Sequence, residues 1–181
     1  MDAQTTDLFH AMIKRCLSQE VAPYYDEWEA AGEMPRSLWR ALGAAGLLGI
    51  DLDEQHGGSG ADIAITQLAL EELSRQGFGG LASAYNIHAN IVMPYLQNLG
   101  TAAQCERWLP AMARGDALGA IAMTEPHAGS DLASMRTRAK RTSDGWELSG
   151  SKIFITNGQF ADLVIVCAKT DPSAGSKGVS L

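Results

Sequence analysis

Cysteine is scarce in this sequence of 181 residues. The three cysteines are Cys16, Cys105 and Cys167. They are odd in number and far apart, so neither a disulfide framework nor a paired-cysteine metal motif is indicated. The four histidines are scattered without ligand-like spacing, and no metal site is predicted. We expect reduced, partly buried thiols.

Basic residues are also few. The 14 Lys and Arg stand against 21 Asp and Glu, which gives a net charge of −7. No run of Lys and Arg could neutralise a row of phosphates, and this excludes nucleic acid as the expected partner. The most apolar stretch, 41–50, contains three glycines and ends before Asp51. It is shorter than the roughly 20 residues that a bilayer span needs, so no membrane span is expected.

The first thirty residues lack the features of a targeting segment. They show neither a basic region followed by an apolar core nor an Arg-rich, acid-poor stretch, because Asp2, Asp7 and Glu20 interrupt them. We expect a bacterial cytoplasmic protein, with the mitochondrial matrix as the alternative for a mature eukaryotic protein. The content of 46% hydrophobic and 19% charged residues is typical of a folded chain with one or two domains.

Apolar residues recur at helical spacing over the first two-thirds of the chain. The expected helices cover residues 7–31, 35–46, 65–77, 81–99 and a stretch that follows Thr101. Thr6 is the expected cap of the first helix, and Thr101 with Gln104 forms a possible capping box for the last. Pro94 removes one backbone donor and should kink the fourth helix.

The period changes near Ala117. LGAIAM is a short apolar run, SMRTRAKR alternates, TSDG is a hairpin-type turn before WELSG, and SKIFIT and DLVIVCAK continue as strands. Helices followed by antiparallel strands predict an α+β protein with a helical domain at 1–117 and a β-domain at 118–181. The final DPSAGSKGVSL reads as a strand cut short, so we expect a truncated β-domain with exposed edges.

The segment 120–131, AIAMTEPHAGSD, is the first candidate for a ligand site. Pro126 restricts the backbone, and Gly129 lets the main chain approach a ligand closely. Thr124 and Ser130 add hydroxyl donors. Such a loop suits a flavin ring and a phosphate, because an oxidised flavin offers hydrogen-bond acceptors and its reduced form gains negative charge. An ordinary connection between strands is the open alternative.

The segment 152–158, KIFITNG, is the second candidate. In a strand, Phe154 and Thr156 would project to the same side. The aromatic ring could cover a flavin face while the hydroxyl meets a ring heteroatom. The alternative is that Phe154 is a plain core residue.

These motifs together resemble the acyl-CoA dehydrogenase family. The resemblance rests on MTEPHAGSDL, RTRAKR, WELSGSKIFITNG and DPSAGSKGVSL, and on WEAAGEMPRSLWRALGAAGLLGI, EQHGGSGAD and IVMPYLQNLGTAAQ before them. Within that family, the motifs most resemble those of the long-chain branch. The family fold implies a helical domain, a middle β-domain and a second helical domain that is absent here, assembled as a homotetramer when complete.

The resemblance also implies which residues hold the cofactor, FAD. The implied flavin contacts are Ile121, Met123, Thr124, Gly129, Ser130, Phe154 and Thr156. Ser130 additionally matches a position near the thioester end of the substrate. His127 stands where the family usually has glycine, so the loop must accommodate a side chain there.

The implied reaction converts a fatty acyl-CoA to the trans-2-enoyl-CoA, with an electron-transferring flavoprotein as the electron acceptor. The family places its catalytic base in the missing domain, so no catalytic residue is expected before Leu181. Glu125 and Asp131 are interpreted as turn and salt-bridge carboxylates. Two alternatives stay open. The first is another flavoenzyme of the same fold, namely an acyl-CoA oxidase, a flavin monooxygenase or a nitroalkane oxidase, and the second is a non-catalytic fragment or helical interaction module without activity. Acyl-chain length is left open too.

Overall fold

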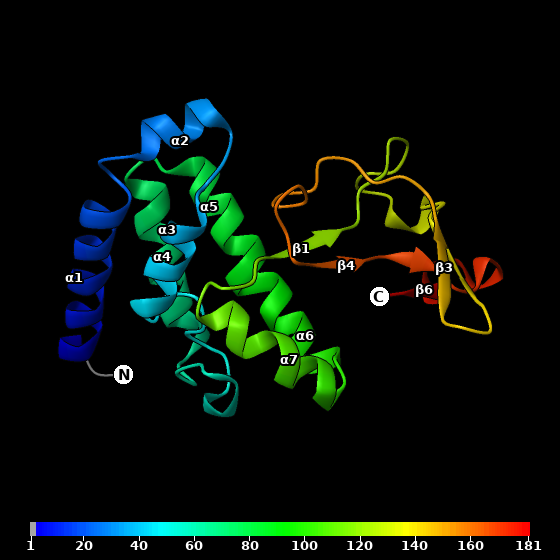
Figure 1. Cartoon of the computed structure of the whole chain (residues 1–181), viewed down its shortest axis with the longest axis horizontal. Helices are drawn as coiled ribbons and strands as arrows, with labels where there is room; N and C mark the ends of the chain where they lie inside the picture. The colour runs from blue at the N-terminus through cyan, green and yellow to red at the C-terminus, as the bar shows by residue number, and fades with distance from the viewer. Residues whose placement is uncertain (1–2) are drawn as a thin grey trace. The chain divides into compact units, whose positions relative to one another are not determined.

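The chain forms two compact units, one ending at Leu118 and the other spanning Gly119–Leu181. The structure is a computed structural model that describes the backbone of residues 3–181 and the side chains of residues 5–181. The elements of the first unit are helices, and the second unit contains short strands joined by loops (Figure 1). The predicted α+β class is therefore confirmed. None of the described helices is long and apolar enough to cross a bilayer.

The first unit contains α-helices, one 3₁₀ turn and one π-helical stretch. The elements are α1 (Ala3–Glu20), α2 (Tyr25–Ala31), α3 (Arg36–Ala44), η1 (Glu54–His56), α4 (Ile63–Arg75), α5 (Gly79–Tyr85), η2 (Asn86–Val92), α6 (Met93–Leu99) and α7 (Ala102–Ala113). The capping box of α7 is present, because Thr101 accepts from the Gln104 N–H and the Gln104 side chain accepts from the Thr101 N–H.

The single helix expected over residues 7–31 is wrong. The chain turns between Glu20 and Tyr25, because Pro23 has no N–H to continue the ladder and disfavours a helical residue before it. Thr6 is not a cap, since α1 begins before it at Ala3.

The kink expected at Pro94 takes the form of a change of helix type. The helical run from α5 to α6 passes through the π-helical stretch η2, which ends one residue before Met93. Pro94 then lies in the first turn of α6. A proline ring clashes with the carbonyl four residues earlier in an α-helix, and the wider π turns relieve that clash.

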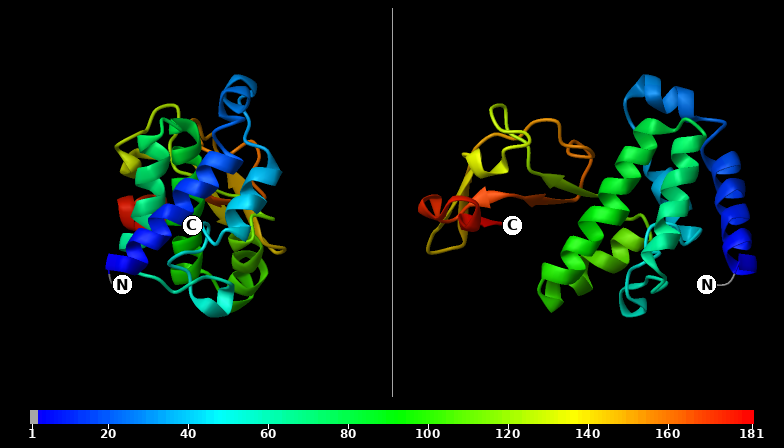
Figure 2. Two further views of the ribbon diagram at one scale, coloured as in Figure 1. Left: turned by 90° about the vertical axis from the view of Figure 1, so that its left-hand side faces the viewer. Right: turned by 180° about the vertical axis from the view of Figure 1, so that it is seen from behind.

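A buried carboxylate joins α1 to α4, which lie side by side (Figure 2). Glu72 is 2% exposed, and its carboxylate accepts hydrogen bonds from His10 at 2.9 Å, from Gln76 at 2.7 Å and from Arg75. Burial alone would raise the pKa of Glu72, but the bonds from Arg75, Gln76 and His10 lower it to about 2. The carboxylate therefore stays ionised inside the unit.

A neutral histidine lies at the centre of the helical core. His88 is 0% exposed, its ring meets the Trp39 ring edge-on at 5.5 Å, and its Nε2 is 3.2 Å from the Met112 carbonyl oxygen. Burial disfavours the charged imidazolium and lowers the pKa of His88 to about 4. The helical unit therefore keeps an uncharged imidazole in place near neutral pH.

The second unit contains six short strands. They are β1 (Gly119–Ala122), β2 (Arg138–Arg141), β3 (Trp146–Ser149), β4 (Leu163–Val166), β5 (Ala168–Lys169) and β6 (Val179–Ser180). β1 pairs with β4, and the other four form a sheet in the order β3-β2-β5-β6. Short 3₁₀ turns lie in the connections at Leu132–Ser134 and within Pro172–Gly178, where the non-helical Gly175 interrupts the segment.

The expectation that all strands pair antiparallel needs correction. The β2–β3 hairpin is antiparallel, as predicted for strands joined by a tight turn, and β5 and β6 are antiparallel across the longer loop 170–178. β1 and β4 are parallel, and so are β2 and β5. The long connections between the members of these two pairs bring the chain back in its original direction.

The expected strand over SKIFIT is also wrong. Phe154 has φ 54° and Asn157 has φ 63°, and this left-handed backbone cannot continue an extended strand. The tight turn predicted at Asn157-Gly158 is present, with the Gly158 N–H donating to the Ile155 carbonyl at 2.9 Å.

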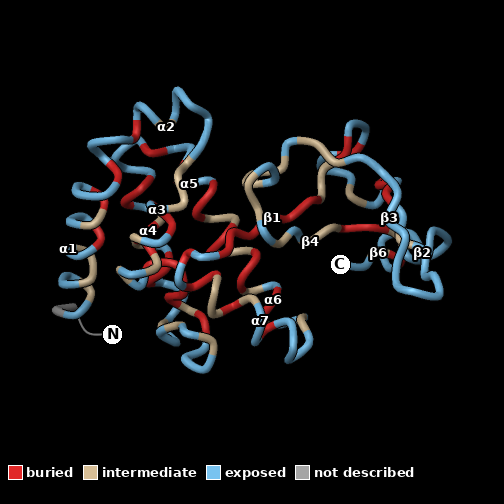
Figure 3. The backbone as a smooth tube through the Cα atoms, viewed as in Figure 1, coloured by how far each residue is buried: buried red, intermediate tan, exposed pale blue. Residues whose placement is uncertain are grey.

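Burial differs sharply between strands of this unit (Figure 3). All four residues of β1 are buried, whereas Trp146 and Leu148 of β3 are 58% and 52% exposed. The apolar run that contains β4 favours a buried strand, but the residues of β4 are half-buried or exposed. β3 and β6 form the two edges of the four-stranded sheet.

The buried His88 predicts acid sensitivity of the helical unit. Its folded pKa of about 4 lies below the unfolded value of 6.5, so the unfolded chain binds the extra proton. The contribution of this pKa difference to the free energy of unfolding is present above pH 6.5 and is lost as the pH falls toward 4. We expect the free energy of unfolding to drop by about 2 kcal/mol between pH 7 and pH 5 through this residue.

Chemical denaturation followed by helical circular dichroism at both pH values measures this drop. His88→Gln keeps a donor but cannot titrate, so it should flatten the dependence even if it lowers stability at pH 7. His56→Gln, at a half-buried histidine of the η1 turn, is the control that should keep the slope. An equal slope in the wild-type chain and His88→Gln would contradict the assignment.

Candidate functional site

The two candidate motifs run side by side in opposite directions. The Ile153 N–H donates to the Thr124 carbonyl at 3.0 Å, and the Lys152 ammonium donates to the Met123 carbonyl at 2.8 Å. At the other end, the Asn157 side-chain amide donates to the Gly119 carbonyl at 3.2 Å. Strand β1 therefore has β4 on one side and the segment 152–157 on the other.

A tight turn follows β1. The Glu125 N–H donates to the Ala128 carbonyl at 2.9 Å, and the Ala128 N–H donates back to the Glu125 carbonyl at 3.1 Å. Pro126 occupies the second position of the turn and His127 the third. Among the described non-glycine residues, only Phe154 and Asn157 have positive φ, so His127 does not. The turn therefore does not need the positive φ that a type II turn requires at its third position, and it accommodates a side chain there.

The Glu125 carboxylate is the anchor of this turn. It is 2% exposed and accepts from the backbone N–H groups of Arg136 at 2.6 Å and Thr137 at 2.9 Å. It also meets the Lys152 ammonium at 3.0 Å and His127 Nε2 at 3.2 Å. Burial alone would raise the pKa of Glu125, but the bonds from Thr137, Arg136 and Lys152 lower it to about 2. One carboxylate thus connects the turn, the start of β2 and the second motif.

Neither acidic residue of the loop is arranged as a general base. A carboxylate with a pKa of about 2 is too weak a base to take a carbon-bound proton near neutral pH. Asp131 is exposed and directly precedes the turn Leu132–Ser134. Its carboxylate accepts a hydrogen bond from the Ser134 hydroxyl. Within the described part of the chain, no group of three His, Cys, Asp or Glu is placed to hold a metal ion.

The expected flavin contacts differ in exposure. Ile121 is buried, Met123, Thr124 and Thr156 are half-buried, and Gly129, Ser130 and Phe154 are exposed. A Cβ added at Gly129 would meet no atom within 4 Å, so the backbone there is open to a ligand. The alternative that Phe154 is a core residue is wrong, because 89% of it is exposed.

Phe154 combines this exposure with a strained backbone. A left-handed conformation is uncommon for a bulky residue and costs on the order of 1–3 kcal/mol. The bonds of Ile153 to Thr124 and of Asn157 to Gly119 hold the segment on both sides of it. Because the Phe154 ring is in solvent, no burial of the ring offsets this backbone strain. Unfavourable backbone conformations of this kind are concentrated at ligand sites.

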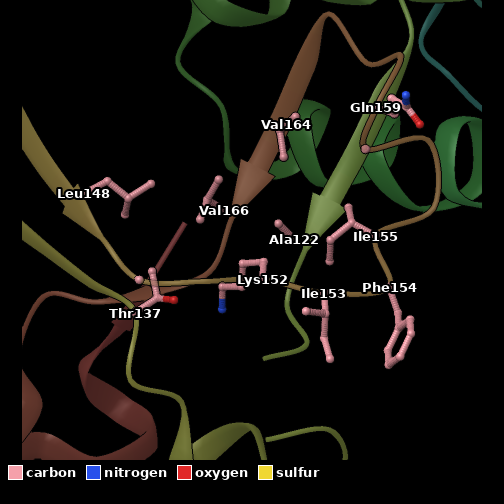
Figure 4. Close-up of a pocket in the computed structure, with 12 residues that line it drawn as sticks. Ala122, Thr137, Leu148, Lys152, Ile153, Phe154, Ile155, Gln159, Val164 and Val166 are labelled. Atoms are coloured by element: carbon pink, nitrogen blue, oxygen red, sulfur yellow. The ribbon is translucent and has the colours of Figure 1, made fainter. Parts of the chain in front are cut away.

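A cavity of about 480 Å³ lies within the β unit (Figure 4). Its apolar lining includes Ala122 of β1, Ile153, Ile155, and Val164 and Val166 of β4. Side chains alternate along a strand, so Ile121 points to the face of β1 opposite Ala122. Among the expected flavin contacts, the lining described for this cavity includes Phe154 alone. Ile121 thus faces away from the cavity, whereas Phe154 is part of its lining.

The sequence reasoning missed the partners of Glu125. Lys152 was part of a quoted motif, but nothing in the sequence linked it to an acid 27 positions earlier. Arg136 and Thr137 donate through their backbone N–H groups, so the identity of their side chains gives no indication of these bonds. The one available hint was an acid at the first position of a proline-containing turn, which favours a local hydrogen-bond acceptor.

The anchoring role of Glu125 predicts a large loss of stability on its removal. Glu125→Ala leaves two N–H groups without their acceptor and removes the counter-charge of Lys152, whose side chain is 10% exposed and whose ammonium keeps only the Met123 carbonyl, so we expect the β unit to lose about 3 kcal/mol or more. Hydrogen exchange at the amides of Arg136 and Thr137 measures the loss. Asp131→Ala, at an exposed carboxylate of the same loop, should change these rates little. Equal exchange in both variants would show that Glu125 is not the anchor.

Known proteins resemble both units of this chain. Residues 3–116 match the acyl-CoA dehydrogenase N-terminal domain, and residues 120–181 match the acyl-CoA dehydrogenase middle domain. The mitochondrial long-chain specific acyl-CoA dehydrogenase of Rattus norvegicus is 48% identical over 177 residues, which cover 97% of this chain and 41% of that enzyme.

Solved structures agree with the sequence matches. An acyl-CoA dehydrogenase from Geobacillus kaustophilus superposes with a TM-score of 0.93 at 41% identity, covering 100% of this chain and 47% of its own. A glutaryl-CoA dehydrogenase from Mycobacterium smegmatis in complex with FADH2 gives a TM-score of 0.87 at 33% identity, covering 94% and 44%. The chain thus spans less than half the length of these relatives. On these matches, the chain belongs to the acyl-CoA dehydrogenase family.

Proposed function

We propose that this chain supplies the flavin-ring contacts of an FAD-dependent acyl-CoA dehydrogenase, which oxidises a fatty acyl-CoA to the trans-2-enoyl-CoA. One observation carries the proposal: the TEPHAGSD loop and the KIFITNG segment run side by side and present an exposed Phe154 and an open Gly129. In this proposal residues 1–117 form the helical domain and residues 118–181 form part of the middle β-domain.

The residues on this face fit a flavin. The hydroxyl groups of Thr124 and Thr156 can donate to acceptors on the ring, and the Phe154 ring can cover one ring face. Ile121 and Met123 would line the ring, since they follow each other along one side of the β1 segment. The M. smegmatis relative, whose structure holds FADH2, supports this choice of cofactor. When bound, FAD supplies the hydride acceptor.

The loop would serve the phosphate and the substrate. Gly129 leaves its backbone open, so an anionic group can approach the main chain without meeting a side chain. Ser130 is exposed and would donate its hydroxyl near the phosphate or the thioester end of the substrate. The fixed turn before them sets where both residues lie.

Proton removal from the substrate α-carbon is assigned to a residue outside this chain. Glu125 remains ionised and accepts hydrogen bonds from Arg136, Thr137 and Lys152, and the Asp131 carboxylate accepts one from Ser134. A base suited to this step needs a pKa nearer the working pH. We therefore expect Glu125 to hold the loop, with no proton transfer of its own.

The proposal extends to the whole protein. Its electron acceptor would be an electron-transferring flavoprotein, and its assembled form a homotetramer. The compartment would be the bacterial cytoplasm, or the mitochondrial matrix for a mature eukaryotic protein. The Rattus norvegicus relative, which is a mitochondrial enzyme, supports the second choice.

Binding of FAD to the 181-residue chain tests this proposal. We expect weak binding, and Phe154→Ala and Gly129→Val should each weaken it about threefold to tenfold by removing ring contact or by blocking the backbone. Titration of FAD fluorescence measures the affinity. Trp146→Ala is the matched control, because Trp146 is an exposed aromatic residue of the same unit outside the proposed face. Equal affinity in all three variants would contradict the site.

Turnover is the second readout. We expect no enoyl-CoA from the 181-residue chain with acyl-CoA and FAD, because the proposed base lies outside it. Mass spectrometry of the thioester products measures this. Enoyl-CoA formation that is lost in Glu125→Gln would show that the base is within this loop after all.

A further inference from the structure

One face of the four-stranded sheet carries a row of basic side chains, which we call the basic face. Arg138 and Lys140 of β2 are exposed, and Lys169 of β5 is half-buried. Arg136 extends the row, because it is exposed while Thr137, between it and Arg138, is buried. We propose that the basic face is a docking surface for a protein partner that presents a row of carboxylates along a helix. This inference goes beyond the proposed function and does not depend on flavin binding.

The register of the strands places these side chains on the same side of the sheet. Successive residues of a strand alternate between the two faces, and residues directly opposite each other on paired strands share a face. Arg138 is opposite Lys169 of β5, and Lys140 is opposite Glu147 of β3. The row therefore extends over two adjacent strands.

The other face of the same sheet is apolar. Ala139, Trp146, Leu148 and Ala168 line a cavity of about 380 Å³ there. These residues alternate along β2, β3 and β5 with the members of the basic face and their partners, which agrees with the register. Apolar packing thus uses one face of the sheet, and the basic face is left to solvent or to a partner.

The basic face has little counter-charge of its own. In the part of the chain that the structure describes, no ion pair joins any of its four members to an acid. Glu147 is the one acid that the strand register places on this face. Bases elsewhere in this acidic chain are paired: Arg75 with Glu72, Lys152 with Glu125, and both Arg40 and Arg114 with Asp116.

The Arg138–Lys169 pair makes this arrangement unfavourable for the free chain. Like charges directly opposite each other in a sheet are destabilising. Here the two charges are opposite each other although the chain has 21 acids and 14 bases. An anionic partner that covers the basic face would neutralise both charges, so the repulsion present in the free chain would be relieved on binding.

The spacing of the bases indicates the chemistry of the partner. Side chains two residues apart on β2 are separated by about 7 Å, and those on adjacent strands by about 5 Å. Carboxylates four residues apart on a helix have Cβ atoms about 5–6 Å apart, so an acidic helix can meet several of these bases at once. Nucleic acid and anionic membranes are extended polyanions, and the net charge of −7 on the whole chain repels them. The observations therefore favour an acidic protein surface.

Binding of an acidic peptide to the 181-residue chain tests the docking surface. The probe is a fluorescent helical peptide with glutamate at every fourth position, and the same peptide with glutamine in these places is its control. Fluorescence anisotropy measures the affinity. We expect the glutamate peptide to bind about tenfold more tightly than the glutamine peptide at low salt, and its affinity to fall as salt is added.

Charge reversal locates the binding on the basic face. Arg138→Glu with Lys140→Glu should weaken binding of the glutamate peptide about tenfold or more. Lys14→Glu with Arg15→Glu makes the same change in net charge at exposed residues of α1, and should weaken binding less than about twofold. Arg138→Gln with Lys140→Gln removes the like-charge pair, so it should fold at least as stably as the wild-type chain and still lose most of the affinity. Circular dichroism checks the fold of each variant.

Four outcomes would overturn the docking surface. They are no binding of the glutamate peptide, equal affinity for the two peptides, affinity that salt does not change, and an equal loss in the two charge-reversed variants. A short DNA duplex and vesicles containing phosphatidylserine are measured in parallel. Tighter binding of either one than of the glutamate peptide, lost in Arg138→Glu with Lys140→Glu, would overturn the choice of a protein partner.

Discussion

The buried carboxylate of Glu125 is the interaction on which the β unit's functional end depends. A charge placed away from water is costly, and here three hydrogen-bond donors from separate parts of the unit offset that cost. Two of these donors are backbone N–H groups at the start of β2, and one is Lys152 of the neighbouring segment. The carboxylate can be satisfied only when these pieces are in place, so it selects one arrangement of a loop that has little apolar burial of its own.

The helical unit uses the same device for a different purpose. Glu72 is as buried as Glu125, and its pKa is also held at about 2 by bonds from neighbouring side chains. Its partner His10 comes from α1, so the charge joins two helices that are distant in sequence. His88 shows the opposite solution, since burial disfavours its charged form and keeps the imidazole neutral.

The sequence predicted the fold where short-range signals decide the structure. Apolar spacing placed α3, α4 and α7 correctly, and the capping box at Thr101 was read from its residues alone. Prediction failed where contacts between distant residues override local preference. Phe154 belongs to a run that favours a strand, yet the bonds of its neighbours to Thr124 and Gly119 hold it in a left-handed conformation. For the candidate site, the loop chemistry and the family resemblance were readable. The pairing of Glu125 with Lys152 was not, because it exists only once the chain is folded.

We place the flavin against Met123, Thr156 and the exposed ring of Phe154, and away from Val164 and Val166 of β4, which line the cavity. The most direct measurement is nuclear Overhauser contact between protons of the bound isoalloxazine ring and assigned methyl groups of the β unit. We predict contacts to the methyl groups of Met123 and Thr156. Contacts to Val164 and Val166 in their place would put the ring in the cavity, and would contradict the account.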